Sequence, residues 1–411
     1  MTIKLLNRVF LLQRMWAKWT LRMRGVSMFL DQQTKSSIEL YKKMLGAVGA
    51  LSKMSSESSI PYIGYREAEN IFCISFDANN LSRSDCSADA SKDGIGIGIK
   101  TFLNGSGKTL QKIAEFNKDA DIFRGKSPKE IVVAVSNLRN ERIRVTKRIH
   151  GLTELIYHCA VRKEGKILIY ECPMDEVDIK SVKGIDAGTK NSITFEDGKN
   201  YYSFNLSKST LYKRFITDNV LLSINIKIVE NPYEALMRLF SEGIAKLKFE
   251  PIKKEMQHVF LPLFSDKGGR HVPERSGLNQ WNSKGRPRDF NEVYIPIPAW
   301  IHKQFPNFFP ARDKVFELHL PDSRRLKAKV CQDGGKALMS NPNLDLGKWL
   351  LRTIMDLNEG EVLKYDKLKN LGLDSVVIYK LDDLNYTIDF TEIGSYDEFY
   401  EECKLTKPLS I

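Results

Sequence analysis

The stretch SADASKDGIGIGIKTF, residues 87–102, decides the fold of the first half of the chain. An aspartate and a short SKDG turn precede an apolar run in which glycine and isoleucine alternate, and this run ends at Lys100. A turn of this kind between two short extended runs is typical of a β-hairpin. The pattern therefore predicts a hairpin with Asp89 near one end and Lys100 near the other.

The glycines of this stretch do not predict a nucleotide site. GIGIG lacks the GxGxxG spacing and lies inside an apolar run, rather than between a strand and a helix. The following GSGKT lacks the first glycine of a phosphate-binding loop, because Phe102 occupies that position. We expect the glycines at 94, 96 and 98 to allow another segment or a ligand to approach the backbone closely.

Asp89 and Lys100 suit the metal-assisted hydrolysis of a phosphodiester. Carboxylate oxygens hold Mg²⁺, and a cation beside the scissile phosphate stabilises negative charge. The predicted hairpin resembles the core of PD-(D/E)xK nucleases, in which an aspartate begins one strand and an acid-x-Lys pair lies on its neighbour. This resemblance implies that Asp89 binds the metal and that Lys100 is catalytic, although Gly98 stands in place of the middle acid.

A second carboxylate is therefore expected from elsewhere in the chain. Glu67 and Glu69 lie in YREAENIFCISF, and Glu115 lies in TLQKIAEFNKDA, which predicts a helix. We favour Glu69 as a metal ligand and catalytic residue, because it immediately precedes an apolar run, and Glu115 remains an alternative metal ligand. The competing interpretation is that Asp89 caps a turn and that Lys100 is a solvated charge. The side chains expected to contact DNA phosphates from this region are Lys108, Gln111 and Lys112.

Hydrophobic spacing and turn signals predict the other elements. Residues 32–56 and 127–149 have helical periodicity, and Ser-Pro at 127–128 is a helix start signal. Strands dominate after residue 155, with a hairpin turn at Glu-Asp-Gly, residues 196–198. Residues 375–390 predict a closing hairpin, and 344–355 a helix. The six cysteines lack zinc spacing and lie in strand-like contexts such as 71–76 and 156–161, so we expect reduced core thiols in a cytoplasmic protein.

Two long polar loops in the second half predict contacts with nucleic acid. Both leave the ends of predicted strands in one small β-domain, so we expect two arms that grip a major groove. Arginine pairs bidentately with guanine, whereas asparagine and glutamine pair with adenine. The candidate DNA-binding residues are Arg270, Arg275, Asn279, Gln280, Trp281, Lys284, Arg286 and Arg288 in the first loop, and Gln332, Lys336, Ser340, Asn341 and Asn343 in the second.

Two segments of this second half resemble the C-terminal DNA-binding domain of NgoFVII-type restriction endonucleases. They are GLNQWNSKGRPRDFNEVYIPIPAWIHKQFPNFFP at 277–310 and KAKVCQDGGKALMSNPNLDLGKWLL at 327–351. That domain is a pseudobarrel of the plant "B-three" type, which reads duplex DNA with two arms. The resemblance implies an N-arm at 267–289 and a C-arm at 332–343.

The catalytic centre is expected in the first half of the chain. The best-known members of that family carry a phospholipase-D-like nuclease with an HxK motif, and none of the six histidines is followed by lysine two residues on. Residues 60–215 resemble instead the metal-dependent nuclease domain of other restriction enzymes.

Length and charge fit a two-domain protein with an anionic partner. The chain has 411 residues and a net charge of +12, and no apolar run is long enough to cross a membrane. We predict a basic extension over residues 1–30, which is either upstream of a true start at Met28 or a targeting helix. We further predict an α/β (α+β) nuclease domain over 31–248 and a mostly-β DNA-binding pseudobarrel over 252–400.

These features predict a type II-like restriction endonuclease that cuts double-stranded DNA with Mg²⁺. A palindromic site would require a homodimer, and a separate methyltransferase would protect host DNA. The alternative is a non-catalytic, sequence-specific DNA-binding regulator, and a third interpretation is an RNA-processing nuclease.

Overall fold

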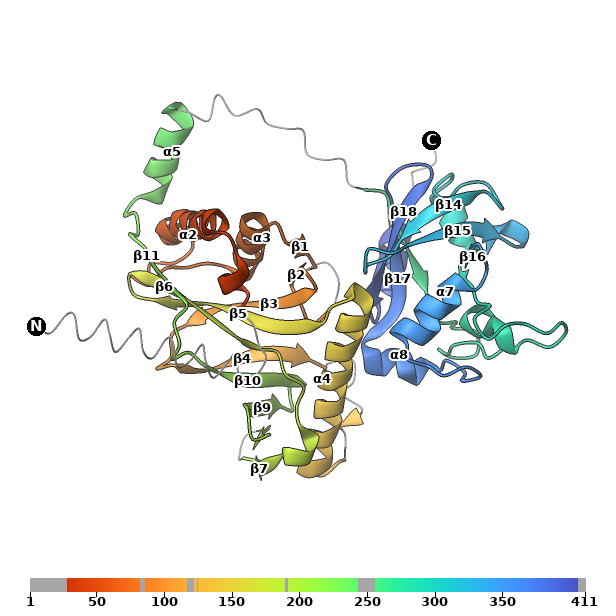
Figure 1. Cartoon of the computed structure of the whole chain (residues 1–411), viewed down its shortest axis with the longest axis horizontal. Coiled ribbons are helices and arrows are strands. Elements are labelled where there is room, and N and C mark those ends of the chain that lie inside the picture. Colours follow the sequence, from red (N-terminus) through yellow and green to blue (C-terminus); the bar gives the residue numbers. More distant parts are fainter. Residues whose placement is uncertain are drawn as a thin grey trace, which may run out of the picture.

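The computed structural model describes residues 28–81, 86–116, 122–123, 125–188, 191–242 and 256–405. Three β-sheets organise this part of the chain (Figure 1). Sheets A and B lie in the first half, and sheet C is formed entirely by the second half. Their strand orders are β1-β2-β3-β5-β6-β11 in sheet A, β4-β10-β9-β8-β7 in sheet B and β12-β17-β18-β14-β15-β16-β13 in sheet C.

Sheet A contains the hairpin that the sequence predicts. Strands β2 and β3 pair antiparallel, and β3 then pairs parallel with β5. The turn between β2 and β3 has positive φ at Asp93 and Gly94. Parallel neighbours need a long crossover connection, and helix α4 forms part of it. The strands are β1 (Asn79–Asn80), β2 (Ala90–Lys92), β3 (Ile95–Leu103), β5 (Glu154–Lys163), β6 (Lys166–Pro173) and β11 (Leu222–Asn225).

The glycines of β3 allow close packing inside the protein. A Cβ atom on Gly96 would lie 2.2 Å from Cδ2 of Leu155, and one on Gly98 would lie 2.6 Å from Cε of Met174. The expectation of close approach is therefore confirmed at positions 96 and 98, where the neighbours are side chains of the same domain. At Gly94 the nearest atom to an added Cβ would be Oγ1 of Thr153 at 3.5 Å, which is an ordinary contact.

Helices α2 (Lys35–Ala50) and α3 (Tyr65–Phe76) pack on one face of sheet A. The prediction of a helix within 32–56 is confirmed, and the hydroxyl of Thr34 caps α2 by accepting a hydrogen bond from the Ser37 amide. The prediction of a strand-like context at 71–76 is wrong, because this segment belongs to α3. Five of its seven buried residues, 68, 71, 72, 75 and 76, follow the spacing of one helix face.

Sheet B corrects a second expectation. The segment TLQKIAEFNKDA is not a helix over its first half: residues Lys108–Glu115 form strand β4, which pairs antiparallel with β10. Pairing with a distant strand overrides the helical preference of this short polar run, because strand propensity depends on context. The predicted hairpin at 196–198 is confirmed by β8 and β9. The remaining strands are β7 (Lys183–Asp186), β8 (Ser192–Glu196), β9 (Tyr201–Asn205) and β10 (Thr210–Ile216).

Sheet C is a nearly closed, barrel-like sheet, as expected for the pseudobarrel. Its end strands β12 and β13 lie beside each other, and the closing hairpin of β17 and β18 is confirmed. The strands are β12 (His258–Pro262), β13 (Ile295–Pro296), β14 (Val315–His319), β15 (Arg325–Cys331), β16 (Ala337–Ser340), β17 (Leu373–Lys380) and β18 (Asn385–Glu392). The helices are α6 (Ala299–Gln304), α7 (Asp345–Gly347), the π-helix η8 (Lys348–Ile354), α8 (Tyr365–Leu371) and α9 (Ser395–Leu405).

Helix α4 (Pro128–His150) joins the two halves (Figure 1). A capping box of Ser127 and Glu130 starts it, which confirms the predicted start signal. Its C-terminal part contributes Val145 and Ile149 to the core of the barrel. Nε of Arg148 on the same part donates a 2.9 Å hydrogen bond to the carbonyl of Ile354. The same helix also contributes Ile143 and Val135 to hydrophobic clusters of the first half, so it packs in the cores of both halves.

Some expectations lie outside the described residues or are only partly covered by them. The predicted extension 1–30 is described only from Met28, and the predicted boundary between 248 and 252 is outside the described ranges. The first half ends, in its described part, with α5 (Pro232–Glu242). Among the residues that the structure describes, none of the six cysteines forms a disulfide bond. Among the helices described here, none is both long and apolar enough to cross a membrane.

Candidate nucleic-acid interface and catalytic hairpin

A groove on sheet C brings the two predicted arms together. Gln280, Arg286 and Arg288 line it from the first arm, and the second arm contributes Gln332, Ser340, Asn341 and Asn343. Convergence of both polar loops on one concave surface is the arrangement that two arms need to read the same groove of DNA.

A buried carboxylate organises the arginines of this groove. Glu292 is only 4% exposed, and its Oε1 accepts a 3.0 Å hydrogen bond from Nε2 of Gln280. The same oxygen pairs with the Arg286 guanidinium and lies 3.6 Å from Nε of Arg288. The two side chains differ in exposure, at 61% for Arg286 and 18% for Arg288. Sequence reasoning missed Glu292, although it follows the basic run RPRDFN directly.

Three of the predicted contact residues stabilise the arms from inside. The side chain of Asn279 is fully buried and bonds the carbonyls of Pro273 and Leu363 and the amide of Leu363, at 2.9–3.0 Å. The hydroxyl of Ser340 accepts a 2.8 Å hydrogen bond from the amide of Leu346. Trp281 packs on the barrel core. Their contacts favour a structural role over contact with bases.

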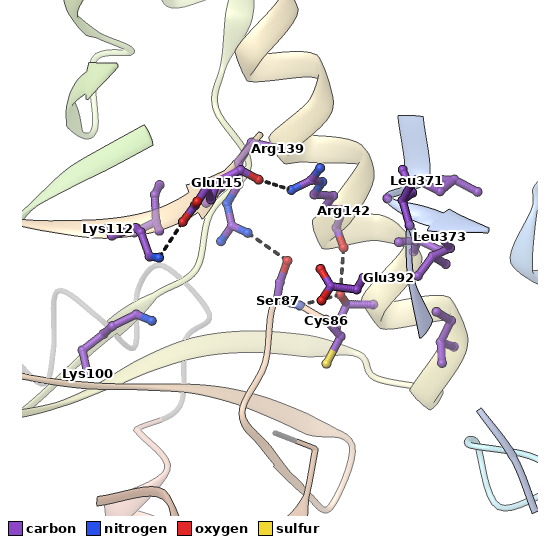
Figure 2. Close-up of a pocket in the computed structure, with 17 residues that line it drawn as sticks. Cys86, Ser87, Lys100, Lys112, Glu115, Arg139, Arg142, Leu371, Leu373 and Glu392 are labelled. Atoms are coloured by element: carbon purple, nitrogen blue, oxygen red, sulfur yellow. Dashed lines mark hydrogen bonds and ion pairs between the residues drawn. The ribbon is translucent and has the colours of Figure 1, made fainter. Parts of the chain in front are cut away.

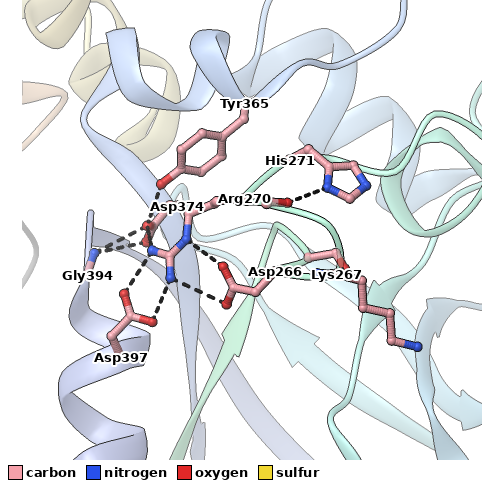
Figure 3. A network of polar contacts seen from close by, with 10 residues as sticks. Asp266, Lys267, Arg270, His271, Tyr365, Asp374, Gly394 and Asp397 are labelled. Atoms are coloured by element: carbon pink, nitrogen blue, oxygen red, sulfur yellow. Dashed lines mark hydrogen bonds and ion pairs between the residues drawn. The ribbon is translucent and has the colours of Figure 1, made fainter.

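Arg270 is held by carboxylates at the base of the N-arm (Figure 3). Its guanidinium pairs with Asp266 at 2.9 Å and Asp397 at 2.8 Å, and lies 3.7 Å from Asp374. The hydrogen bonds that the Arg270 guanidinium donates to the Asp397 carboxylate are the main reason that the pKa of Arg270 is raised. Burial is the main reason that the pKa of Asp374 is raised. These three acids favour an arm-anchoring role for Arg270 over contact with DNA.

The other predicted cations are exposed and do not line this groove. Arg275, Lys284 and Lys336 are exposed, and none of the three forms an ion pair within the described ranges. Lys336 lines a different cavity, next to the base of the N-arm.

Strand β15 adds a row of cations that sequence reasoning missed. Arg325, Lys327 and Lys329 occupy every second position, so they face the same side of the sheet. Lys329 lines the groove itself. The signal was present in RRLKAKVC as basic residues with the period of a strand.

The hairpin of β2 and β3 brings Asp89 and Lys100 into electrostatic reach of each other. Oδ2 of Asp89 accepts a 2.6 Å hydrogen bond from the amide of Ile99. Burial raises the pKa of Asp89, and the charges of Lys100 and Arg66 and the Ile99 bond oppose that shift. Within the described part of the chain, Lys100 forms no ion pair.

Glu69 reaches the same region from helix α3. It is buried, and its Oε2 lies 3.6 Å from the Arg66 guanidinium. Burial raises the pKa of the Cys73 thiol to about 11, and the charges of Glu69 and then Asp89 add to the shift. Both carboxylates therefore lie within electrostatic reach of the same two groups, the Arg66 guanidinium and the Cys73 thiol. Across the described ranges, no group of three or more His, Cys, Asp or Glu side chains is arranged to hold a metal ion.

Glu115 lies apart from this pair, on β4. Its carboxylate pairs with Lys112 at 2.8 Å, and both side chains line a cavity that Lys100 also lines. Gln111 and Lys112 therefore project from a strand, not from the helix that we expected, and Lys108 begins that strand.

Comparisons with known proteins concern the second half of the chain. Among curated proteins, none matches the chain. Residues 251–382 match the family described as the NgoFVII C-terminal B3-like DNA-binding domain. This match supports sequence-specific binding of double-stranded DNA by that part of the chain, which is similar to the DNA-binding domain of a restriction enzyme.

Proposed function

We propose that the protein is a type II-like restriction endonuclease, whose α/β domain cuts both DNA strands with Mg²⁺ while the pseudobarrel selects the site. One observation carries this proposal: both polar arms meet on one groove of a barrel that is similar to a restriction-enzyme DNA-binding domain. If the barrel selects a DNA site as part of a restriction enzyme, a nuclease centre is expected elsewhere in the chain. The acid and the lysine of the β2–β3 hairpin are our candidates for that centre.

The carboxylates of Asp89 and Glu69 would hold the metal ion. Mg²⁺ in nuclease-type sites takes one or two protein carboxylates and completes its shell with water and substrate phosphate, so a pair of acids is compatible with the absence of a larger cluster in the described residues. A bound Mg²⁺ polarises the phosphate and neutralises charge. Burial disfavours the charged form of Asp89, which a cation beside it would offset.

Lys100 is proposed to stabilise the negative charge that develops on the phosphate. Its ammonium has no competing ion pair in the described residues, and it lies in the field of Asp89. The hydrogen bond from the Ile99 amide holds Asp89, which directly precedes β2, against β3, the strand that carries Lys100. A cation that is already in position stabilises developing negative charge most strongly where water is partly excluded.

Recognition is proposed to use the groove for bases and its margins for phosphates. Arg286 and Arg288 favour guanine, and Gln280 and Asn341 favour adenine, so a site that contains G·C pairs is a hypothesis. The row along β15, with Arg275 and Lys284, would contact the backbone. A homodimer for a palindromic site, a separate methyltransferase and a cytoplasmic location are part of the same proposal.

The test is cleavage of genomic DNA with Mg²⁺, with EDTA as the control, followed by sequencing of the ends. Ends at one recurrent sequence support a restriction enzyme. Sequence-specific gel shifts without cleavage would leave the non-catalytic regulator, an alternative for which the DNA-binding domain matched at residues 251–382 is sufficient. Cutting of RNA alone would indicate the third interpretation. Glu69→Gln should remove cleavage, and a fully active variant would move the second ligand to Glu115.

A further inference from the structure

A cavity lies where the first half of the chain meets the barrel (Figure 2). Its volume is about 500 Å³. Lys100 and Lys112 line it from the sheets, Arg139 and Arg142 from α4, and Glu392 with the segment 371–373 from the barrel. In Figure 2 the ammonium groups of Lys100 and Lys112 and the guanidinium of Arg139 point into the same space.

The lining of this cavity has an excess of positive charge. Four cationic side chains and two carboxylates, Glu115 and Glu392, line it. Glu115 is paired with Lys112 at 2.8 Å. The remaining lining groups are neutral, so two positive charges are not balanced by the wall itself.

Arg139 carries the most unfavourable of these charges. It is 3% exposed, Nη1 donates to the hydroxyl of Ser87 and Nη2 donates to the hydroxyl of Tyr157, each at 2.8 Å. Both partners are neutral, because burial raises the pKa of Tyr157 to about 12. Within the described residues no carboxylate forms an ion pair with Arg139. A buried charge without a counter-charge is costly, so this site favours an anion.

We propose that the cavity binds a phosphate group, with Arg139 and Lys100 as its cations. A phosphate dianion matches the excess of two positive charges. The N–H groups of Arg139 that Ser87 and Tyr157 do not use can donate to its oxygens, and a phosphate fits the volume easily. This inference does not rest on the proposed cleavage: it rests on the charge balance around Arg139, and its test measures no cleavage.

The phosphate has two possible sources, and the probes separate them. One probe is inorganic phosphate, and the other is a deoxydinucleotide with a single internal phosphodiester, which is too short to form a duplex. Thermal unfolding is measured at constant ionic strength set with NaCl. At a hundredfold excess over Kd, the wild-type melting temperature should rise by about 5 °C. A rise with phosphate indicates a free phosphate ligand, whereas a rise with the dinucleotide alone indicates the nucleic-acid backbone.

Two variants on the same helix make the test specific. Arg139→Met should melt at the same or a higher temperature without an anion, because it removes an unbalanced charge, and it should not respond to either probe. Arg144→Met is the matched control: Arg144 pairs with Glu141 at 3.0 Å and with Glu176 on the surface, so this variant should keep the full response.

Two results would overturn the proposal: no response of the wild type to either probe, or an equal response of Arg139→Met. If Arg139→Met does not fold, calorimetric titration of wild type and Lys100→Met with phosphate decides the question. The proposal then requires one site per chain in the wild type and at least tenfold weaker binding in Lys100→Met.

Discussion

Replacing Glu292 by glutamine should reduce sequence discrimination while strengthening non-specific DNA binding. Oε1 of Glu292 is the common acceptor for Gln280 and the two arginines of the groove. Glutamine keeps the shape and one acceptor oxygen but removes the charge, and neutral hydrogen bonds are about half as strong as charge-assisted ones. We expect the interactions that hold the first arm in place to be weakened by about 1–2 kcal/mol. This value is already discounted because Arg286 is largely exposed.

This loss corresponds to about 5- to 30-fold lower preference for the cognate site. The groove also gains one net positive charge, so the slope of log K against log salt should steepen by about 0.9. The assay begins with selection of the wild-type site from random duplexes. Competition between that site and random DNA is then measured from 50 to 200 mM salt. Glu401→Gln is the control, because Glu401 pairs with Lys404 on α9 at 2.7 Å and does not line the groove. Unchanged discrimination, or weaker non-specific binding, would refute the role given to Glu292.

Three further substitutions test the remaining assignments. Lys100→Ala should abolish cleavage but leave gel-shift affinity within about twofold, whereas an equal loss of both would make Lys100 structural. Asp89→Asn should unfold at a higher temperature than wild type at pH 8 in EDTA, because burial raises the pKa of Asp89 and the fold loses stability as pH rises through that pKa. The advantage should shrink at acid pH, and a lower melting temperature at pH 8 would contradict the reasoning. Arg270→Met should cost about 2–3 kcal/mol in urea unfolding, because three carboxylates lose their partner. An unchanged free energy of unfolding would show that Arg270 does not anchor the arm.

Local sequence patterns were sufficient where one element carries its own signal. The turn at Asp93 and Gly94 predicted the β2–β3 hairpin, and Ser127-Pro128 predicted the start of α4. They failed where a distant partner decides the outcome. Strand β4 forms because β10 pairs with it, and nothing within its own eight residues reveals that neighbour.

The DNA-binding loops followed the same rule. Composition identified both arms, and the groove contains residues of each. Composition does not distinguish an exposed arginine from one that is surrounded by three carboxylates. Arg286 and Arg270 were therefore both predicted to contact DNA. The difference depends on Asp374 and Asp397, which lie more than a hundred residues away. Glu292 was missed because the sequence does not show that its carboxylate is buried beside Gln280, Arg286 and Arg288.

Helix α4 limits how freely the specificity of this protein can be re-engineered. Chimaeras that exchange recognition domains assume that the chain connection is the only link between a DNA-binding domain and the domain beside it. Here Val145 and Ile149 of α4 belong to the hydrophobic core of the barrel. A transplanted barrel would therefore need a core that accommodates these two side chains. The practical unit of exchange is the barrel together with the last turns of α4, and grafts that exchange residues 256–405 without these turns should yield insoluble or poorly coupled hybrids.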